Sequence, residues 1–344
     1  ALFYAVMFVS TIFAAATGIV GASVTILGIM AGKTMIRTGY DTRLSAGLIC
    51  AGGTLGILIP PSIMLVVMGP VLEIPVTDLF AAAIMPGILL ACLYAAYTTL
   101  RCYLNPKLGP VLPANEQPTN MAKVWYEFIM GLIPPAGLVF FALGSILFGL
   151  ATPTEGAGMG AFGAILLALA YKKLTLPGLK DALLKTLEIT ALIMFLVAAS
   201  NFFGAVFSKL GTPSLLTDFL LNLEVNRYVI LAIIMAAIFL LGWPLEWVPI
   251  VLIVLPIVLP LVIELGFNLT WFAILVAVNL QTAWLSPPVA LSAYFLKGVV
   301  PEWDLKDIYL GMMQFMVIQV IGLVLIIIFP KIALWLPGVM YPSP

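Results

Sequence analysis

Two short segments combine hydroxyl side chains with a proline pair inside otherwise apolar stretches. The first is GGTLGILIPPS, Gly52–Ser62, and the second is QTAWLSPP, Gln281–Pro288. Proline removes a backbone donor and glycine relaxes the backbone, so each segment predicts an interrupted helix. The interruption would leave carbonyl oxygens without their helical partners.

The chemistry that these segments offer is ion and anion binding. Carbonyl oxygens and the hydroxyls of Thr54, Ser62, Thr282 and Ser286 are hard oxygen ligands, the kind that hard cations such as Na⁺ take. A helix restarting after Pro61 would direct its positive end at the break, which suits a substrate carboxylate. The alternative is a proline kink between packed helices. The second segment lacks the glycines of the first, so its backbone is expected to be less permissive.

Two further segments lie upstream of these breaks and are expected to form the turns of helical hairpins. The first, AAATGIVGAS at residues 14–23, is made of small residues, which let backbone approach an ion or pack closely against another helix. The second, Gly242–Glu246, carries a carboxylate between two apolar arms. A carboxylate at membrane depth is expensive and usually faces a cavity, a cation or a partner. Alternatively, Glu246 lies shallower or is protonated.

Composition sets the class of protein in which these segments sit. The chain has 344 residues, of which 63% are apolar and 9% are charged, and its mean hydropathy is +1.19. A soluble domain of this size must keep a wettable surface, so the sequence predicts an all-α polytopic membrane protein. Zero net charge and no basic stripe argue against nucleic-acid binding. The sequence has no histidine, no GxxxxGK[ST] loop and no nucleophile–base constellation, so no organic cofactor and no enzymatic activity are expected.

The sequence contains an internal repeat. Under a shift of 227 residues, Gly39 aligns with Gly266, and the first proline pair aligns with the second. With a two-residue insertion, Asp78 aligns with Asp307. The second half has about a hundred further residues upstream, from Met130 to Arg227, and the first half has none. Helices preceding residue 1 are therefore expected to be missing from this chain.

The repeat and the apolar runs predict a topology of two hairpins, two broken crossings and several continuous crossings. The hairpins are Leu2–Arg37 and Val229–Leu265, the broken crossings are Leu44–Leu72 and Leu269–Leu296, the continuous crossings are Asp78–Tyr103, Tyr126–Leu150, Gly156–Tyr171, Thr186–Phe207 and Ile308–Trp335, and Leu176–Leu184 is a short amphipathic segment. Twelve lysines and arginines then fall on one side, against Lys209, Arg227 and Lys331 on the other. This asymmetry makes that side cytoplasmic and the two hairpins inverted relative to one another.

A further motif, ATPTEG at residues 151–156, lies between two predicted crossings. Thr152 or Thr154 is expected to cap the helix that follows, with Glu155 in its first turn. This structural role is favoured over ligand binding.

These motifs resemble a known family. TGIVGASV at Thr17–Val24, the first break, GLATPTEGAG at Gly149–Gly158 and the second SPP are similar to the large, DctM-like membrane subunit of tripartite ATP-independent periplasmic (TRAP) transporters. The resemblance covers essentially the whole chain. It implies a sodium-driven, elevator-type importer of the ion-transporter superfamily in the bacterial inner membrane, with inverted repeats, two re-entrant hairpins and a small carboxylate as substrate.

The resemblance also implies site residues, each hairpin and break together holding one Na⁺. The sodium-binding candidates are Thr17, Gly18, Gly52, Thr54 and Pro60 in the first half and Gly242, Glu246, Thr282 and Ser286 in the second. The substrate-binding candidates are Ser23, Gly53, Pro61, Ser62 and Pro288. Many members of the family carry Asp where this chain has Glu246.

The implied partners are a small membrane subunit with four helices and a periplasmic substrate-binding protein. The expected division of the chain is a transport domain of residues 1–75 and 226–300, and a scaffold of residues 76–225 and 301–344. One alternative is a stand-alone sodium–carboxylate symporter that needs no binding protein. Others are a channel or membrane scaffold subunit and, least favoured, an intramembrane enzyme. The substrate itself is not encoded in any motif.

Overall fold

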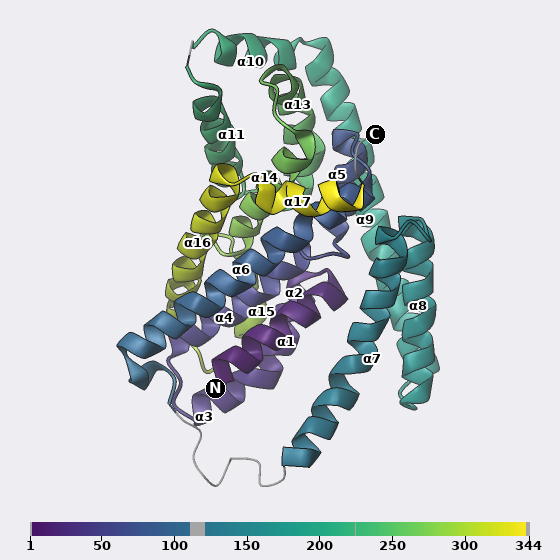
Figure 1. Cartoon of the computed structure of the whole chain (residues 1–344), viewed down its shortest axis with the longest axis vertical. Coiled ribbons are helices and arrows are strands. Elements are labelled where there is room, and N and C mark those ends of the chain that lie inside the picture. Colours follow the sequence, from purple (N-terminus) through teal and green to yellow (C-terminus); the bar gives the residue numbers. More distant parts are fainter. Residues whose placement is uncertain (1, 111–120, 224, 342–344) are drawn as a thin grey trace.

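The computed structural model of this chain describes residues 2–110, 121–223 and 225–341, without the side chains of residues 14–17, 121 and 127. Within these residues every regular element is a helix, which confirms the predicted all-α class (Figure 1). The first half contains both a helix pair joined at a tight turn and an interrupted helix. Its elements are α1 (Leu2–Thr17), α2 (Val20–Leu27), a π-helical turn (Gly28–Gly32), α3 (Lys33–Arg37), α4 (Thr42–Thr54), a 3₁₀ turn (Leu55–Ile57), α5 (Ile63–Leu72) and α6 (Val76–Leu104).

The second half repeats this order. Its elements are α11 (Arg227–Leu241), α12 (Trp247–Pro249), a π-helical turn (Ile250–Val254), α13 (Leu255–Glu264), α14 (Leu269–Gln281), a 3₁₀ turn (Thr282–Trp284), α15 (Leu291–Val299), α16 (Leu305–Ile328) and α17 (Lys331–Met340). A peripheral group of helices joins the two halves. It consists of a short 3₁₀ turn (Pro106–Leu108), α7 (Met121–Leu147), α8 (Pro153–Ala170), α9 (Leu176–Lys209) and α10 (Thr212–Leu221).

Six helices of the described residues are long and apolar enough to cross a membrane. They are Val76–Leu104, Ala122–Leu147, Pro153–Ala170, Leu176–Lys209, Trp247–Glu264 and Leu305–Ile328. The shorter apolar helices of both halves are the ones that meet at turns and breaks. This pattern fits a polytopic membrane protein.

Two predicted boundaries were wrong. Leu176–Leu184 and Thr186–Phe207 are parts of one 34-residue helix, α9, because no proline or glycine follows Gly178 until Gly204. Conversely, the predicted crossing Ile308–Trp335 is two helices. Pro330 has no N–H to donate and disfavours helical backbone at Phe329, so α16 ends there and α17 begins after it.

The predicted cap between α7 and α8 is confirmed. The Thr152 hydroxyl accepts a hydrogen bond from the Glu155 backbone N–H at 3.3 Å, and the Glu155 carboxylate accepts one from the Thr152 N–H at 2.8 Å. This capping box satisfies two backbone donors at the start of α8. The motif is accounted for by local structure.

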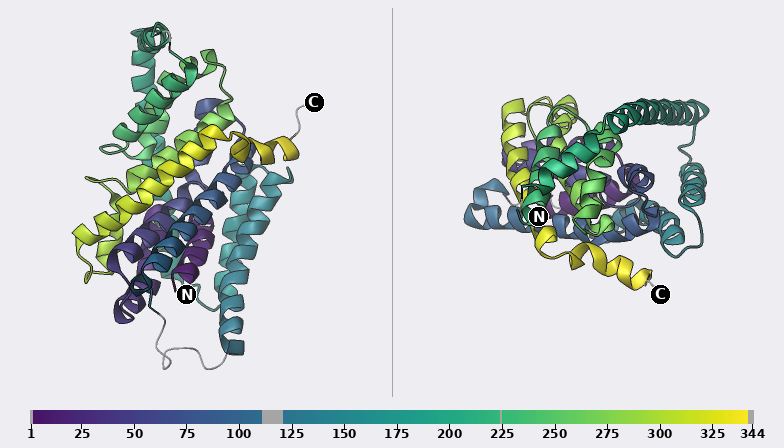
Figure 2. Two further views of the ribbon diagram at one scale, coloured as in Figure 1. Left: turned by 60° about the vertical axis from the view of Figure 1, so that its left-hand side comes forward. Right: turned by 90° about the horizontal axis from the view of Figure 1, so that it is seen from above.

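The centre of the molecule is a layer formed by α4, α6, α14 and α16, with the hairpins packed on it and α7, α8 and α9 along one side (Figures 1 and 2). Helices α4 and α16 approach especially closely, since a Cβ on Gly47 would lie 2.5 Å from the Gly311 carbonyl oxygen. Outside this contact, Arg43 pairs with Asp307 at 2.8 Å. The interrupted helix of the first half is therefore held by α16, the long helix of the second half.

Candidate functional site

The first break separates α4 from α5. After Thr54 the chain makes one 3₁₀ turn, passes through a cis Pro60–Pro61 bond, and restarts as α5 at Ile63. Ser62 is the N-cap of α5, and its hydroxyl accepts from the Leu65 N–H at 3.4 Å and donates to the Ile57 carbonyl at 2.5 Å. Among the described residues, no hydrogen bond reaches the carbonyl oxygens of Pro60 and Pro61. The break thus presents backbone oxygens beside the start of a helix.

The glycines of this segment do not form the break. Gly52 and Gly53 lie inside α4, completely buried, contrary to the expectation that they relax the backbone there. A Cβ on Gly52 would lie 2.5 Å from the Ser10 Oγ of α1, and one on Gly53 would lie 2.4 Å from Cγ2 of Val24 in α2. Their role is to let both arms of the first hairpin pack against α4.

The turn of the first hairpin lies against the break. Gly18 joins α1 to α2 with φ +62°, which favours glycine, and a Cβ there would lie 3.0 Å from the Pro61 carbonyl oxygen. Thr17 is the last residue of α1, and its side chain lies outside the described residues. Ser23 is buried in α2, next to the Val24 that contacts Gly53. The structure therefore brings Gly18, Ser23 and the first break together.

The second break has the same plan. Helix α14 ends at Gln281, a 3₁₀ turn follows, and a cis Pro287–Pro288 bond precedes α15. The carbonyls of this break are more engaged than those of the first. Those of Trp284 and Ser286 accept from the Ser292 hydroxyl and the Ala290 N–H, and the exposed Pro288 carbonyl accepts from Tyr309 Oη at 3.4 Å. No serine caps α15, whose N-cap is Ala290.

The hydroxyl groups of the two breaks share one arrangement. Thr54 donates to the carbonyl of Ala51 at 2.7 Å, and Thr282 donates to the carbonyl of Asn279 at 2.6 Å. Ser286 donates to the Thr282 carbonyl at 2.7 Å. A hydroxyl that has given its hydrogen to the backbone keeps acceptor lone pairs, which suits a cation ligand.

The turn of the second hairpin lies against the second break. A Cβ on Gly242 would lie 3.2 Å from the Cβ of Ala283. Glu246 is exposed, and it lines a small hollow with Gly242, Ala283 and Trp284. Among the described residues, no group of three or more His, Cys, Asp or Glu side chains is placed to hold a metal ion. Glu246 is therefore a single carboxylate in a hollow whose other lining residues are Gly242 and apolar side chains.

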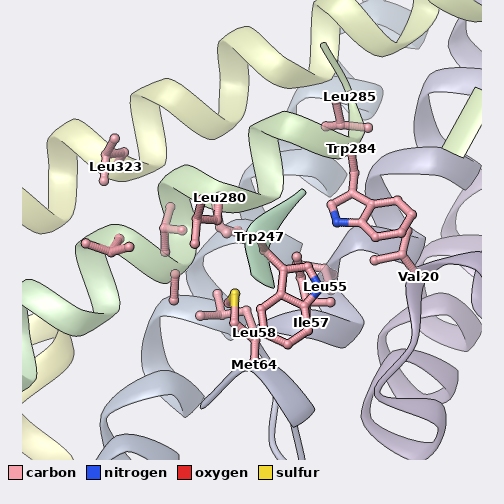
Figure 3. Close-up of a cluster of buried hydrophobic side chains, with 14 of the residues drawn as sticks. Val20, Leu55, Ile57, Leu58, Met64, Trp247, Leu280, Trp284, Leu285 and Leu323 are labelled. Atoms are coloured by element: carbon pink, nitrogen blue, oxygen red, sulfur yellow. The ribbon is translucent and has the colours of Figure 1, made fainter. Parts of the chain in front are cut away.

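Both hairpins and both breaks meet at one buried apolar cluster (Figure 3). Val20 comes from the first hairpin, Leu55 and Leu58 from the first break, Trp247 from the second hairpin and Trp284 from the second break. All five are less than 9% exposed. The polar candidates of the two halves therefore flank a shared apolar centre.

The side of the first break that faces α7 is apolar. One cavity of about 490 Å³ is lined by Ile59, Pro60, Ile88 and Phe140 among others, and a second of about 290 Å³ borders Pro61 and Phe80. Among the described residues, no charged side chain lines either cavity. A charged ligand here would rely on the backbone and hydroxyls of the break.

Several buried polar side chains near the breaks were not singled out from the sequence. Asn279 donates to the Met235 carbonyl of α11 at 2.8 Å, and Gln319 of α16 donates to Gln281 Oε1 at 2.7 Å. The Tyr94 hydroxyl of α6 is buried without a hydrogen-bond partner among the described residues. For Asn279, Gln281 and Gln319 the available signal was an amide inside an apolar run, because burying such a polar group in a membrane helix is expensive.

Comparison with known proteins gives one family for nearly the whole chain. Residues 1–332 match the family described as "Tripartite ATP-independent periplasmic transporter, DctM component". The chain is 29% identical over 330 residues to the C4-dicarboxylate TRAP transporter large permease protein DctM of Pseudomonas aeruginosa, covering 95% of this chain and 75% of that protein.

Relatives with other named substrates are similar to nearly the same extent. The sialic acid TRAP transporter large permease protein SiaM of Vibrio cholerae is 28% identical over 314 residues, 90% of this chain and 71% of its own length. The isethionate TRAP transporter permease protein DctMQ of Oleidesulfovibrio alaskensis is 27% identical over 288 residues, 83% of this chain and 44% of its own length.

Proposed function

The chain belongs to the family of DctM components of tripartite ATP-independent periplasmic transporters, and from this membership we propose that it imports a small organic acid across the bacterial inner membrane together with Na⁺. It is a transporter component and not an enzyme. The proposed coupling of transport to Na⁺ rests on one observation, that both hairpins and both helix breaks meet at one buried apolar cluster (Figure 3). Broken helices at the interface of inverted repeats are where secondary transporters bind ions and substrates.

Two Na⁺ sites are proposed, one in each half. The first uses the Thr54 hydroxyl and the backbone around Pro60, with Gly18 and Gly52 letting the hairpin approach and Thr17 at the turn. The second uses Thr282, Ser286 and the backbone near Gly242, with Glu246 as the anionic group. Support comes from the hydroxyls' donation to backbone carbonyls, which leaves their lone pairs for a cation.

The substrate carboxylate is proposed to bind at the first break. There Ser62 caps α5, whereas the carbonyl oxygens of Pro60 and Pro61, which are not used within the described residues, suit the Na⁺ proposed for the same half. The start of α5 offers backbone N–H groups and the positive end of a helix, whereas α15 has no such side-chain cap. Gly53 lies against Val24 of α2, the residue after Ser23, and Pro288 of the second break is proposed as a further substrate-binding residue. The relatives named for dicarboxylate, sialic acid and isethionate transport support a small organic anion as the proposed substrate.

The proposed mechanism is an elevator movement in which the hairpins are re-entrant and the breaks move with them. The contacts between α4, α6 and α16 favour a moving body larger than residues 1–75 and 226–300. Gly311 lies against the Arg43 carbonyl, and Gln314 of α16 accepts from Arg101 and Tyr97 of α6 at 2.6 and 2.7 Å. With α6, α16 and the α17 that packs on α6 in the moving body, the scaffold within this chain reduces to the peripheral helices α7 to α10.

The proposed partners are a small membrane subunit and a periplasmic binding protein. Helix α9 supports this assignment. Only 6% of its most apolar 18-residue stretch is buried within the chain, so the remainder needs lipid or another protein to cover it. The name DctMQ of one relative describes a single permease protein, which is consistent with a close association of a large and a small membrane part.

Uptake into proteoliposomes tests the proposal. The complete membrane complex would be supplied with radiolabelled organic acids, with the Na⁺ gradient and the binding protein each present or absent. Uptake that requires both supports the proposal. Uptake that needs Na⁺ but no binding protein would identify a stand-alone symporter, and equilibration indifferent to Na⁺ would exclude coupling in favour of a channel.

A further inference from the structure

Two fully buried glutamines connect the second break to α16. Gln281 is the last residue of α14, and Gln319 lies in the middle of α16. Both are 0% exposed. Gln319 Nε2 donates to Gln281 Oε1 at 2.7 Å and to the Val278 carbonyl at 3.4 Å. The pair thus joins the end of one helix to the side of another within an apolar layer.

The pair is incompletely satisfied. Gln281 Nε2 and Gln319 Oε1 are buried without a hydrogen-bond partner within the described residues. Turning both amides over would exchange the roles of the two residues and would still leave one donor and one acceptor unused. Two leucines at these positions would leave no buried polar atom unpaired. The one hydrogen bond between the amides therefore does little to offset the cost of burying their unpaired polar atoms. A role in positioning the neighbouring break explains the pair better than a contribution to stability.

The pair sits where it can control the break. Gln281 directly precedes the 3₁₀ turn that begins with Thr282. A second contact from α16 comes three residues before Gln319, where Met316 Sδ lies 3.0 Å from Ser286 Oγ. On the opposite side Asn279 is bonded to the carbonyl of Met235 in α11. The start of the break is therefore fixed between the second hairpin and α16.

The first half has no such pair. By the repeat, Gln281 corresponds to Thr54 and Gln319 corresponds to Leu90. The Thr54 hydroxyl is bonded within its own helix. The amide pair is therefore a feature of the second break and not a general requirement of the repeat.

We propose that Gln319 is a positioning residue for the second Na⁺ site, acting through Gln281 to hold Thr282 and Ser286 at their places in the break. The inference rests on the proposed function, since it assumes that this break binds Na⁺. It predicts that loss of the amide pair changes the affinity for Na⁺ more than the maximal rate of transport. A packing role alone would change stability and leave the Na⁺ affinity as it is.

The test uses the Gln319→Leu, Gln281→Leu and double Leu variants of the complete complex. Gln314→Leu is the matched control, because Gln314 is an amide on the same helix that bonds α6 instead of the break. Na⁺ activation of uptake and the Na⁺-induced rise in melting temperature are both measured. Each single variant is expected to raise the half-saturating Na⁺ concentration by roughly three- to tenfold, the range of one lost hydrogen bond. The double variant should be no worse than either single one, because the residues act as a pair.

Three results would overturn the inference. If Gln319→Leu lowers only the melting temperature or the maximal rate and leaves the half-saturating Na⁺ concentration unchanged, the amide pair has a packing role alone. An equal shift in Gln314→Leu would show that any amide on α16 has this effect. Wild-type uptake and melting that are both indifferent to Na⁺ would remove the site itself, and this outcome alone also contradicts the proposed function.

Discussion

At three consecutive positions before the turn, the first break carries Gly52, Gly53 and Thr54, and the second carries Asn279, Leu280 and Gln281. The first set lets neighbouring helices approach the backbone closely. The second set reaches outward, with one amide bonded to α11 and one to α16. Both breaks nevertheless continue through a 3₁₀ turn and a proline pair.

Comparing the two breaks shows that the same backbone path can be stabilised by different contacts. The second break follows the same course without any glycine, so glycine is not needed for the interruption. What differs is the surrounding contact. In the first half, side chains of the hairpin pack against glycine backbone. In the second half, amide side chains of the break region reach a backbone carbonyl of α11 and a side chain of α16. The two halves should therefore respond differently to substitutions at equivalent positions.

The largest effect is expected at Leu280, the counterpart of Gly53. Leu280 is 1% exposed, and Leu280→Ala would leave a cavity that destabilises the protein by about 2–5 kcal/mol. Thermal or denaturant unfolding of the purified complex measures this change. Leu240→Ala, at a side chain that is 56% exposed, is the control, and an equal loss there would remove the distinction between buried and peripheral leucines.

The opposite substitution is expected to harm the first break by overfilling. Gly53→Ala would place a Cβ 2.4 Å from Cγ2 of Val24 and should destabilise the protein by about 1–3 kcal/mol. Gly131→Ala in α7 is the control, because a Cβ there meets nothing within 4 Å. If both variants melt at the wild-type temperature, close approach of the hairpin is not what Gly53 provides.

A smaller effect is expected from Ser62→Ala. The change removes the N-cap of α5, at about 0.5–2 kcal/mol of stability, and should weaken substrate binding more than Na⁺ binding. Substrate and Na⁺ dependence of uptake, measured on the same preparation, separate the two. Ser286→Ala in the second break should show the reverse preference, and identical profiles for both variants would contradict the assignment of different ligands to the two breaks.

The smallest effect is expected at the ion pair between Arg43 and Asp307. The pair is partly exposed, with side chains 51% and 33% accessible, so removing it should cost about 0.2–1 kcal/mol. A double-mutant cycle with Arg43→Gln and Asp307→Asn, repeated at high salt, measures the coupling. The value should fall as salt rises, and a coupling well above this range would give the pair a larger part in holding α4 to α16.

Much of the fold follows from local sequence signals. The proline pairs marked both breaks, Gly18 and Gly242 marked both turns, and Thr152 with Glu155 marked a capping box that the structure contains. The single course of α9 was missed because its first turns are charged although no residue in them ends a helix. The end of α16 before Pro330 could have been predicted from that proline, but the continuous apolar run favoured a single crossing.

The candidate site was less accessible from sequence. Its residues were assigned by position in the repeat, and the Na⁺ and substrate roles given to them remain predictions. Contacts between segments far apart in the chain could not be read, such as Gln281 with Gln319 or Gly52 with Ser10. A glycine in a sequence looks the same whether it bends the backbone or admits a neighbouring helix. Only the packed structure distinguishes the two.

The length of α9 has a consequence for the surrounding membrane. Its 34 residues span about 51 Å at the rise of an α-helix, whereas a hydrocarbon core is about 30 Å thick. The neighbouring α8, with 18 residues, spans only about 27 Å by the same rise. Such a pair cannot match one bilayer thickness without tilt or protrusion. We therefore expect α9 to lean or to extend beyond the lipid surface, which makes this helix the part of the chain that responds most directly to a thicker or thinner membrane.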